Sequence, residues 1–503
     1  MKNRRRSGTS IRAFYETLSW MTMRLRSTSR KTAAQSSAPL EENQPANRTA
    51  SRPGPLAEAA FEPQVSFTIV APATPPAAGG VGVLRLSGPA ALPIARAIVP
   101  GIGALPSPRR AYFADFVDSH GAVLDQGLFI YFRAPHSYTG EDVVELQAHG
   151  SPRLLQILQA EMLRDPRVRL AEPGEFTRRA FLNGRLDLAR AEAIADLVAA
   201  DSEAAVRAAA KQLRGTLSSK IRELREPLKA LQADLEGLLN FPDEAEGADA
   251  GLAQRLSSLG SLARGLLASA SRGILVRRGA RVVLYGPVNA GKSTLFNRLL
   301  GEARALVDDE PGTTRDAVEA RLELSGLSVT LVDTAGLRCN PARLEALGIE
   351  RTRESLRTAQ LAILVLPPRA AGREVNEWLA EAGDSPVLRV RSKCDLGLGA
   401  GSGDLQVSGR TGAGIGELEQ AVASRLWGDG APQAVDLTSE RHADAVRRAS
   451  ECIERAIDAA GASTLEVVSG EVGLAVEALG EITGENAPDV LLDAIFERFC
   501  IGK

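Results

Sequence analysis

A phosphate-binding loop constrains the fold of this 503-residue chain more than any other feature. Residues 286–293 read Gly-Pro-Val-Asn-Ala-Gly-Lys-Ser and directly follow the apolar run 282–285, which predicts a β-strand. The two glycines let the backbone curl so that successive N–H groups face a polyphosphate, and the helix expected to begin at the loop adds its dipole. Lys292 can reach the β- and γ-phosphates, and the Ser293 hydroxyl can ligate Mg²⁺. The loop therefore predicts a nucleotide-binding α/β domain, and an ordinary glycine turn is the alternative.

Two downstream motifs can complete a Mg²⁺ site beside this loop. Residues 328–332 predict a strand that ends in Asp333-Thr334-Ala335-Gly336. The acid can hold Mg²⁺ through water, and the last glycine can donate its N–H to a γ-phosphate. Residues 311–316, which lie between the loop and this strand, read Pro-Gly-Thr-Thr-Arg-Asp, and their threonines can fill further Mg²⁺ positions. The order of these motifs resembles that of a Ras-like GTPase.

Recognition of the base is expected from two later segments. Predicted strands at 361–366 and 387–390 precede Ser392-Lys393-Cys394-Asp395, whose aspartate can accept hydrogen bonds from the N1–H and exocyclic amine of guanine. GTPases usually carry Asn where Ser392 stands. Serine cannot offer both an amide donor and an acceptor, so the motif predicts a preference for guanine but leaves nucleotide affinity open. The predicted nucleotide contacts are Asn289, Ala290, Gly291, Lys292, Ser293, Thr294, Asp308, Asp309, Glu310, Pro311, Gly312, Thr313, Thr314, Asp333, Thr334, Ala335, Gly336, Ser392, Lys393, Asp395, Ser408, Gly409 and Arg410.

The composition is that of an ordinary globular protein, with 44% apolar and 24% charged residues. Its length predicts about three domains. The four cysteines lie far apart without a Cys-x-x-Cys pair, which indicates neither a disulfide framework nor a zinc site and suits a reducing compartment. No apolar run approaches the roughly 20 residues that span a bilayer, so we expect a cytoplasmic location and no membrane contact.

The N-terminal extension, residues 1–64, differs in charge from the rest of the chain. Residues 1–60 hold eleven Lys and Arg and four Glu, a net charge of +7 in a chain whose net charge is −2. Their Ser/Thr/Pro-rich composition without a sustained apolar period predicts disorder. We expect a start codon upstream of the true one in a bacterial protein, and a mitochondrial transit peptide is the alternative. The body, at −9, is no obvious stand-alone binder of nucleic acid.

The segments around the GTPase predict two further domains. Residues 66–182 combine strand-like runs with a helical stretch, as a small α/β domain does. Residues 183–278 form a first helical part, in which apolar residues from Leu217 to Leu238 recur in alternating four- and three-residue steps. The helical pattern breaks at 240–244 and resumes around 252–275, and residues 429–503 are helical again. The predicted fold class is therefore α/β plus all-α, in which a Ras-like P-loop domain at 279–428 is inserted into one discontinuous helical domain.

Six further motifs carry a resemblance to a known family, and ordinary small GTPases have none of them. They are Gly79-Gly80-Val81-Gly82-Val83-Leu84-Arg85, Tyr138-Thr139-Gly140-Glu141-Asp142, Pro173-Gly174-Glu175-Phe176-Thr177, Ala180-Phe181-Leu182-Asn183-Gly184-Arg185-Leu186-Asp187-Leu188, Asn240-Phe241-Pro242-Asp243 and Phe499-Cys500-Ile501-Gly502-Lys503. From about Thr68 to Lys503 the chain resembles the tRNA-modifying GTPase family known as MnmE or TrmE.

The resemblance implies a K⁺-stimulated GTPase that modifies carbon 5 of the wobble uridine in tRNA, adding an aminomethyl or carboxymethylaminomethyl group. It implies an FAD-dependent partner protein in a heterotetramer. It also implies an N-terminal domain that forms the homodimer and binds a tetrahydrofolate derivative, 5-formyl- or 5,10-methylene-tetrahydrofolate, as one-carbon donor.

The implied folate contacts are Arg85, Glu145, Arg185 and Lys503, and Cys500 is implied to take part in the modification. Arg185 stands where the family also has lysine, which keeps the charge but changes the hydrogen-bond geometry. Without the resemblance, Arg85 would be read as a surface charge after a strand, Glu145 as a solvated strand residue and Cys500 as inert.

The resemblance also implies the ions of the nucleotide site. The Asn289 side-chain oxygen can ligate K⁺, and the loop 308–314 would wrap this ion with backbone carbonyls, including those of Asp308, Glu310 and Thr313. Ser293 and Thr314 would hold Mg²⁺. Glu345 is expected to orient the attacking water, because Leu337 is apolar near the position where many GTPases carry Gln, and Glu350 is the rival.

Two other functions stay open. The chain could be a regulatory GTPase whose output is a conformational change, with all covalent chemistry on the partner, and folate binding would separate the two. It could also be a ribosome-assembly GTPase, against which the acidic body and the lack of an RNA-binding appendage argue.

Overall fold

The structure is a computed structural model that describes residues 67–240, 251–302, 304–305, 318–334, 352–370, 372–397, 404–427, 436–462 and 464–503. The predicted basic extension at 1–64 lies outside these residues, as do the predicted ion-binding loop 308–314 and the candidate water-orienting residues Glu345 and Glu350.

A six-stranded sheet is the first element of the described chain. Its strands are β1 (Thr68–Pro72), β2 (Gly79–Ser87), β3 (Ala111–Val117), β4 (Val123–Phe132), β5 (Val143–Gly150) and β6 (Val168–Leu170), in the order β3-β4-β5-β2-β1-β6. Neighbouring strands are antiparallel except β1 and β6, which are parallel.

Two helices, α2 (Ala91–Ile98) and α3 (Pro152–Met162), share a hydrophobic core with one face of this sheet. In β2, Leu84 and Leu86 are buried in that core, so the alternation of the strand turns Arg85 to the opposite face. A short helix, α4 (Glu175–Leu182), follows β6.

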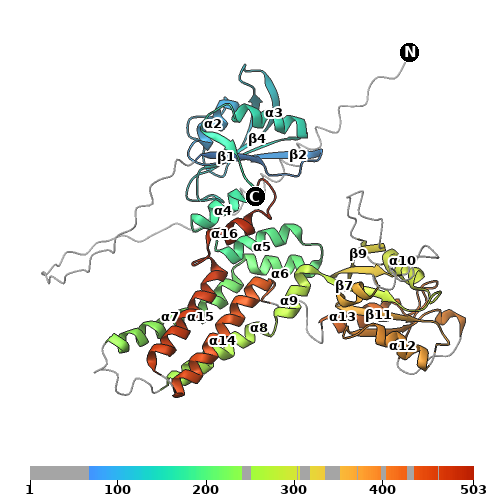
Figure 1. Ribbon diagram of the computed structural model, residues 1–503. Coiled ribbons are helices and arrows are strands. Elements are labelled where there is room, and N and C mark those ends of the chain that lie inside the picture. Colours follow the sequence, from blue (N-terminus) through green and yellow to red (C-terminus); the bar gives the residue numbers. More distant parts are fainter. Residues whose placement is uncertain are drawn as a thin grey trace, which may run out of the picture. The chain divides into compact units, whose positions relative to one another are not determined.

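The helical domain is built from both flanks of the inserted domain (Figure 1). Its helices are α5 (Leu188–Ala199), α6 (Glu203–Leu213), α7 (Thr216–Asn240), α8 (Leu252–Leu267), α9 (Ala270–Arg278), α14 (Glu440–Ala462), α15 (Leu465–Thr483) and α16 (Asp489–Phe496). One core joins Leu224 and Leu228 of α7 to Leu256 of α8, Ala449 of α14 and Val472 of α15. The predicted apolar seam of α7 is therefore the face that packs against partner helices, including helices encoded more than 200 residues later.

The inserted domain has a seven-stranded sheet in the order β13-β12-β11-β7-β10-β9-β8. Its elements are β7 (Ala280–Tyr285), α10 (Lys292–Glu302), β8 (Arg304–Ala305), β9 (Val318–Leu324), β10 (Leu327–Asp333), β11 (Leu361–Leu366), α12 (Arg373–Glu381), β12 (Val387–Arg391), the 3₁₀ turn η4 (Cys394–Leu396), β13 (Leu405–Gln406) and α13 (Ile415–Trp427). The five strands from β13 to β10 are parallel, and β9 and β8 continue the sheet antiparallel. The predicted fold class, α/β plus all-α with an inserted P-loop domain, is confirmed.

Among the helices of the described residues, none combines the length and the apolar content needed to cross a membrane.

Candidate functional sites

The phosphate loop joins the carboxyl end of β7 to the start of α10. Gly286 (φ 135°), Asn289 (φ 61°) and Gly291 (φ 94°) have positive φ angles, which curl the loop. A Cβ on Gly286 would lie 2.4 Å from the Val365 carbonyl oxygen, so only glycine fits between this loop and β11. Lys292 is buried, and its Nζ donates to the Gly286 and Pro287 carbonyl oxygens at 2.9 and 2.8 Å. The Lys292 ammonium group is therefore held against the backbone of the loop.

A cavity of about 590 Å³ opens in front of this loop. Its lining residues are Val288, Asn289, Gly291, Lys292, Ser293, Thr294 and Lys393. The volume is that of a small-ligand site, and the lining includes two lysines beside hydroxyl and amide side chains. Such a lining suits a polyphosphate.

Two side chains that the sequence predicts beside Mg²⁺, Ser293 and Asp333, meet at the end of the loop. Ser293 Oγ donates to Asp333 Oδ2 at 2.7 Å. Asp333 ends β10, which runs parallel to β7 with Asp333 opposite Leu284, and this register brings the carboxylate to the hydroxyl. A hydroxyl and a carboxylate are oxygen ligands of the kind Mg²⁺ takes, with phosphate oxygens and water completing the shell. The described residues contain no group of three or more His, Cys, Asp or Glu suited to a metal.

The segment after β12 forms hydrogen bonds with the backbone of the phosphate loop. Ser392 Oγ donates to the Ala290 carbonyl oxygen, and Lys393 Nζ donates to the Asn289 carbonyl oxygen at 2.8 Å. Asp395 lies in η4 and is exposed, so its carboxylate is available to a base. The structure thus joins the phosphate loop to the predicted base-recognition motif.

The segment after β13 packs against α10. Ser408 is fully buried, and its Oγ accepts a hydrogen bond from the Thr411 N–H at 3.1 Å. A Cβ on Gly409 would lie 3.0 Å from the Thr294 carbonyl oxygen, which explains a glycine at this position. Arg410 is exposed beside them.

The remaining predicted nucleotide and ion contacts lie outside the described residues. These are Asp308, Asp309, Glu310, Pro311, Gly312, Thr313, Thr314, Ala335 and Gly336, together with Glu345 and its rival Glu350. The K⁺ positions in this set, the second Mg²⁺ ligand and the water-orienting acid therefore stay predictions.

A second site surrounds Arg85 on the open face of the N-terminal sheet. Arg85 and Glu145 are cross-strand neighbours on β2 and β5 and form an ion pair, with Nη2 2.8 Å from Oε1. The guanidinium also lies over the rings of Tyr138 and Phe176, 5.5 and 5.7 Å from their centroids. Arg85 lies within its strand, and its side chain is only 20% exposed. It is therefore not the simple surface charge that the sequence alone would suggest.

The C-terminal tail reaches this second site. Arg85 Nη1 donates to the Gly502 carbonyl oxygen at 3.5 Å. A Cβ on Gly502, whose φ is 97°, would lie 2.0 Å from the Pro72 carbonyl oxygen, so the tail lies against the end of β1. Cys500 is exposed, and the Lys503 N–H donates to the Cys500 carbonyl oxygen at 3.3 Å. The structure therefore brings Arg85, Glu145 and the tail together.

Arg185 is connected to this site through the loop that carries Tyr138. It is exposed, and a Cβ on Gly140 would lie 3.3 Å from Arg185 Cγ. Tyr138 is mostly buried, and burial raises the pKa of its phenol, against the opposing effects of Thr177 and Arg85. Its ring is therefore a neutral platform beneath the Arg85 guanidinium.

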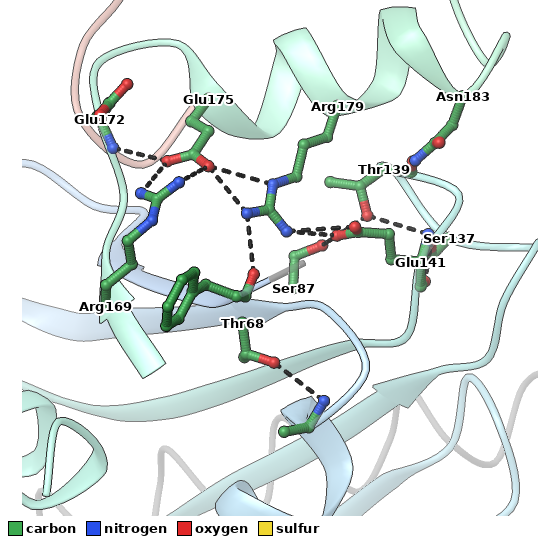
Figure 2. Close-up of polar contacts among 12 residues, drawn as sticks. Thr68, Ser87, Ser137, Thr139, Glu141, Arg169, Glu172, Glu175, Arg179 and Asn183 are labelled. Carbon is green, nitrogen blue, oxygen red and sulfur yellow. Dashed lines mark hydrogen bonds and ion pairs between the residues drawn. The ribbon is translucent and has the colours of Figure 1, made fainter. Parts of the chain in front are cut away.

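An ion-pair network behind this loop was not predicted from the sequence (Figure 2). Arg179 on α4 contacts Glu141 Oε2 at 3.0 Å and Glu175 Oε1 at 2.9 Å, and Arg169 on β6 contacts Glu175 Oε1 at 2.6 Å. Ser87 at the end of β2 donates to Glu141 Oε2 at 2.7 Å. Burial raises the pKa of Glu175, but the two arginines and the Glu172 N–H outweigh it, so that its pKa is lowered.

This network fixes the loop at 137–142 and helix α4 around Arg85. Glu141 and Glu175 lie in two of the distinctive sequence motifs, which marks them as candidates for a role. No sequence feature, however, indicates that they pair with Arg179.

Comparisons with known proteins agree with this arrangement. The family profile described as the MnmE helical domain matches residues 188–500, and that described as the GTP-binding protein TrmE N-terminus matches residues 68–185. A Myxococcus xanthus protein named tRNA modification GTPase MnmE is 65% identical over 438 residues, which cover 87% of this chain and 99% of that protein. A Chromobacterium violaceum protein of the same name is 43% identical over 451 residues, which cover 87% of this chain and 98% of that protein.

Among solved structures, the G domain of the T. maritima FeoB iron transporter is 24% identical, with a TM-score of 0.24. The match covers 29% of this chain and 98% of the FeoB chain.

One profile spans more than half of the chain, and both relatives are matched over nearly their whole length. The chain therefore belongs to the MnmE family, whose members named here are tRNA modification GTPases.

Proposed function

We propose that this protein hydrolyses GTP and uses the hydrolysis in tRNA modification. The observation that carries the nucleotide part is the loop between β7 and α10, with Lys292 buried inside it and the Ser293–Asp333 pair at its end. Asp395 accepts from the Watson–Crick edge of guanine, which selects GTP over ATP. Membership of the MnmE family supports tRNA as the object of the modification.

Hydrolysis depends on charge placed around the phosphates. Lys292 holds the β- and γ-phosphates, and the loop N–H groups face the same oxygens. If Mg²⁺ binds here, Ser293 and Thr314 would hold it, Asp333 would act through water, and the ion would supply positive charge to the phosphates. Glu345 orients the attacking water.

K⁺ is the further ion of this proposal. Asn289 lies exposed in the loop, with its carbonyl oxygen held by Lys393, which leaves the side-chain oxygen to a cation beside the phosphates. The test is GTP turnover in K⁺, Na⁺ and Rb⁺ at equal ionic strength. K⁺ and Rb⁺ are expected to raise kcat by at least tenfold over Na⁺, and Asn289→Ala is expected to remove the difference. Equal turnover in all three salts would rule the ion out.

The N-terminal domain is proposed to bind a tetrahydrofolate derivative. Its support is the Arg85–Glu145 pair, whose guanidinium lies over two aromatic rings, because a folate has aromatic rings, hydrogen-bonding ring nitrogens and carboxylates. Arg185 and Lys503 would meet the carboxylates. Calorimetric titration with 5-formyl-tetrahydrofolate tests this, and Arg85→Met should weaken binding at least tenfold. The absence of binding to the full protein would favour a regulatory GTPase whose partner does all the covalent chemistry.

The same domain is proposed to form a homodimer. Support comes from the open face of the sheet, where Phe113 is 57% exposed and Leu128 and Ile130 are only partly buried. A second copy of the domain could bury such an exposed apolar face in a symmetric dimer, where both subunits use the same surface. Cys500, on the tail beside Arg85, would act in the addition to carbon 5 of the wobble uridine, together with an FAD-dependent partner protein.

A further inference from the structure

We propose that Ser392 serves only to tether the phosphate loop, and that this protein consequently recognises guanine by its Watson–Crick edge alone. The proposal rests on the proposed guanine-nucleotide site. It makes Ser392 a positioning residue, and it leaves N7 of the base without a side-chain donor.

The hydroxyl of Ser392 is surrounded by acceptors. Its Oγ lies within hydrogen-bond distance of the Ala290 carbonyl oxygen and 3.2 Å from the Leu366 carbonyl oxygen. The backbone N–H of Ser392 also donates to Leu366, at 2.9 Å. A serine hydroxyl has one hydrogen, and a carbonyl oxygen can only accept. That hydrogen is therefore committed to the backbone of the loop or of β11.

The burial of Ser392 agrees with this role. The residue is 4% exposed, and it is not among the residues that line the cavity in front of the loop, whereas its neighbour Lys393 is. A Cβ on Gly291 would lie 3.6 Å from both Cβ and Oγ of Ser392, so the side chain packs directly against the loop. With Lys393 Nζ on the Asn289 carbonyl oxygen, two consecutive residues hold two consecutive loop carbonyls. The loop is thus held firmly without any contact to a base.

Because the Ser392 hydroxyl binds the loop, it cannot also donate to guanine, and this limits which edge of the base the protein recognises. Guanine presents N1–H and its exocyclic amine on one edge, and the acceptors N7 and O6 on the other. The Asp395 carboxylate can only accept, so it can serve only the first edge. An asparagine amide has two hydrogens, so that one could bind the loop carbonyl while the other reached N7. Serine at position 392 has no second hydrogen to give.

Nucleotide analogues test the proposal on the unchanged protein. Displacement of a fluorescent GDP is measured with GTP, 7-deaza-GTP, which lacks N7, and inosine triphosphate, which lacks the exocyclic amine. We expect 7-deaza-GTP to bind within about twofold of GTP and inosine triphosphate about tenfold or more weaker, because the exocyclic amine, unlike N7, has a charged partner in Asp395. Binding of 7-deaza-GTP at least fivefold weaker than GTP would overturn the proposal. Failure of every guanine nucleotide to displace the probe would instead overturn the proposed GTP site, and this inference with it.

Two variants of the same residue separate the tether from base recognition. Ser392→Ala should weaken GTP and 7-deaza-GTP by the same factor, since both depend equally on the loop. Ser392→Asn should bind GTP about three- to tenfold more tightly than 7-deaza-GTP, the value of one added hydrogen bond. An unchanged ratio in a folded Ser392→Asn protein, or an altered ratio in Ser392→Ala, would contradict the proposal. If Ser392→Asn does not fold, the wild-type measurement still decides the question.

Discussion

At the scale of single residues, three side chains in the turn after β12, those of Ser392, Lys393 and Asp395, have different surroundings. Ser392 is buried and bound to backbone carbonyls, Lys393 has a φ of 59° and crosses to the loop, and Asp395 is exposed. The unusual backbone at Lys393 directs its side chain across the loop while Asp395 remains free to meet a base. One turn therefore supports the loop and presents the carboxylate that we propose to recognise the base.

Asp395→Asn is expected to change the preferred base from guanine to xanthine. In the proposed site the carboxylate would accept from two guanine N–H groups, whereas an amide would donate to the carbonyl at position 2 of xanthine. GTP affinity should fall about tenfold to a hundredfold, as expected for lost charge-assisted hydrogen bonds, while xanthosine triphosphate gains. Competition binding with both nucleotides measures this, and Glu417→Gln in α13 is the control. Unchanged GTP affinity in the variant would show that Asp395 does not contact the base.

Individual contacts were predictable from sequence only where a motif fixes the spacing. The Ser293–Asp333 pair follows from a phosphate loop and a neighbouring parallel strand, whose motifs have known relative positions. The partners of Arg179 could not be predicted in this way. Its guanidinium contacts the Phe67 carbonyl oxygen and Glu141, which lie 112 and 38 residues away in the sequence. Only the packing of α4 on the sheet brings them together.

At the scale of elements, the chain leaves the helical domain through α9 and returns beside the same helix. The Asp436 carboxylate binds Lys211 of α6 at 2.9 Å and Lys220 of α7 at 2.6 Å, and its N–H donates to Ser269 Oγ at 3.4 Å. The next residue, Leu437, is fully buried in the helical core. The outgoing helix and the return segment are therefore attached to each other and to the bundle.

Gly273→Ala should disrupt this attachment. A Cβ on Gly273 of α9 would lie 1.8 Å from the Leu437 carbonyl oxygen, so the backbone of the return segment would have to move. We expect a loss of about 2 kcal/mol or more in stability, in the range of overpacked sites. Hydrogen exchange of the amides at 436–439 would locate the effect.

Gly265→Ala in α8 is the matched control for that substitution. This glycine also lies inside a helix, but a Cβ there would meet nothing within 4 Å. The control should be neutral or more stable by up to about 1 kcal/mol, because alanine favours the helix. Equal effects of the two substitutions would contradict the close contact between α9 and the return segment.

A buried charge cluster ties the two flanks of the helical domain. Glu192 on α5 binds His442 Nε2 at 2.6 Å and Arg441 Nη2 at 2.9 Å, both on α14. Burial raises the pKa of Glu192, but His442 and Arg441 outweigh it and lower the pKa from 4.5 to about 2. A carboxylate with a lowered folded pKa stabilises above its unfolded pKa, and this stabilisation disappears as the pH falls through the folded value.

The helical domain should therefore lose stability between about pH 4.5 and pH 2. Glu192→Gln should cost about 3 kcal/mol at pH 7, because it leaves two buried partners without a carboxylate, and it should flatten this part of the pH profile. Thermal unfolding followed by circular dichroism at several pH values measures both effects. Glu203→Gln, whose ion pair with Arg207 is exposed, is the control and should change stability by less than about 1 kcal/mol. A pH profile that does not change in Glu192→Gln would contradict the assignment.

The sequence predicted the elements that have a strong period and missed those that do not. The seam of α7 was readable because its apolar residues recur at helical spacing, and β7 because it precedes the phosphate loop. Strand β6 has three residues and pairs with β1 across about a hundred intervening residues, and the edge strand β3 buries only its last two residues. Neither strand has a local pattern long enough to identify it.

At the scale of the whole molecule, the fold places two kinds of chemistry on one chain. The nucleotide site is formed at the carboxyl ends of parallel strands, where open α/β sheets bind their ligands. The Arg85 site is closed by the last residues of the chain, which continue from α16 of the helical domain. The helical domain is therefore covalently joined to both, and the coupling that we propose between the two sites would pass through α9 and the return segment.

If the helical domain couples the two sites, substitutions at Cys500 and at Asp333 should affect GTP turnover and uridine modification differently. Cys500→Ser should abolish modification of the wobble uridine but leave GTP turnover intact, because the exposed thiol lies on the tail and makes no part of the phosphate loop. Asp333→Ala should stop both activities, because the Ser293 hydroxyl loses its partner and the Mg²⁺ shell loses its acid. GTP turnover and mass-spectrometric analysis of uridine modification are measured on the same preparations, with Cys452→Ser as the cysteine control. A Cys500→Ser protein that still modifies tRNA would remove the tail from the chemistry. An Asp333→Ala protein that modifies tRNA without hydrolysing GTP would show that the two sites are not coupled.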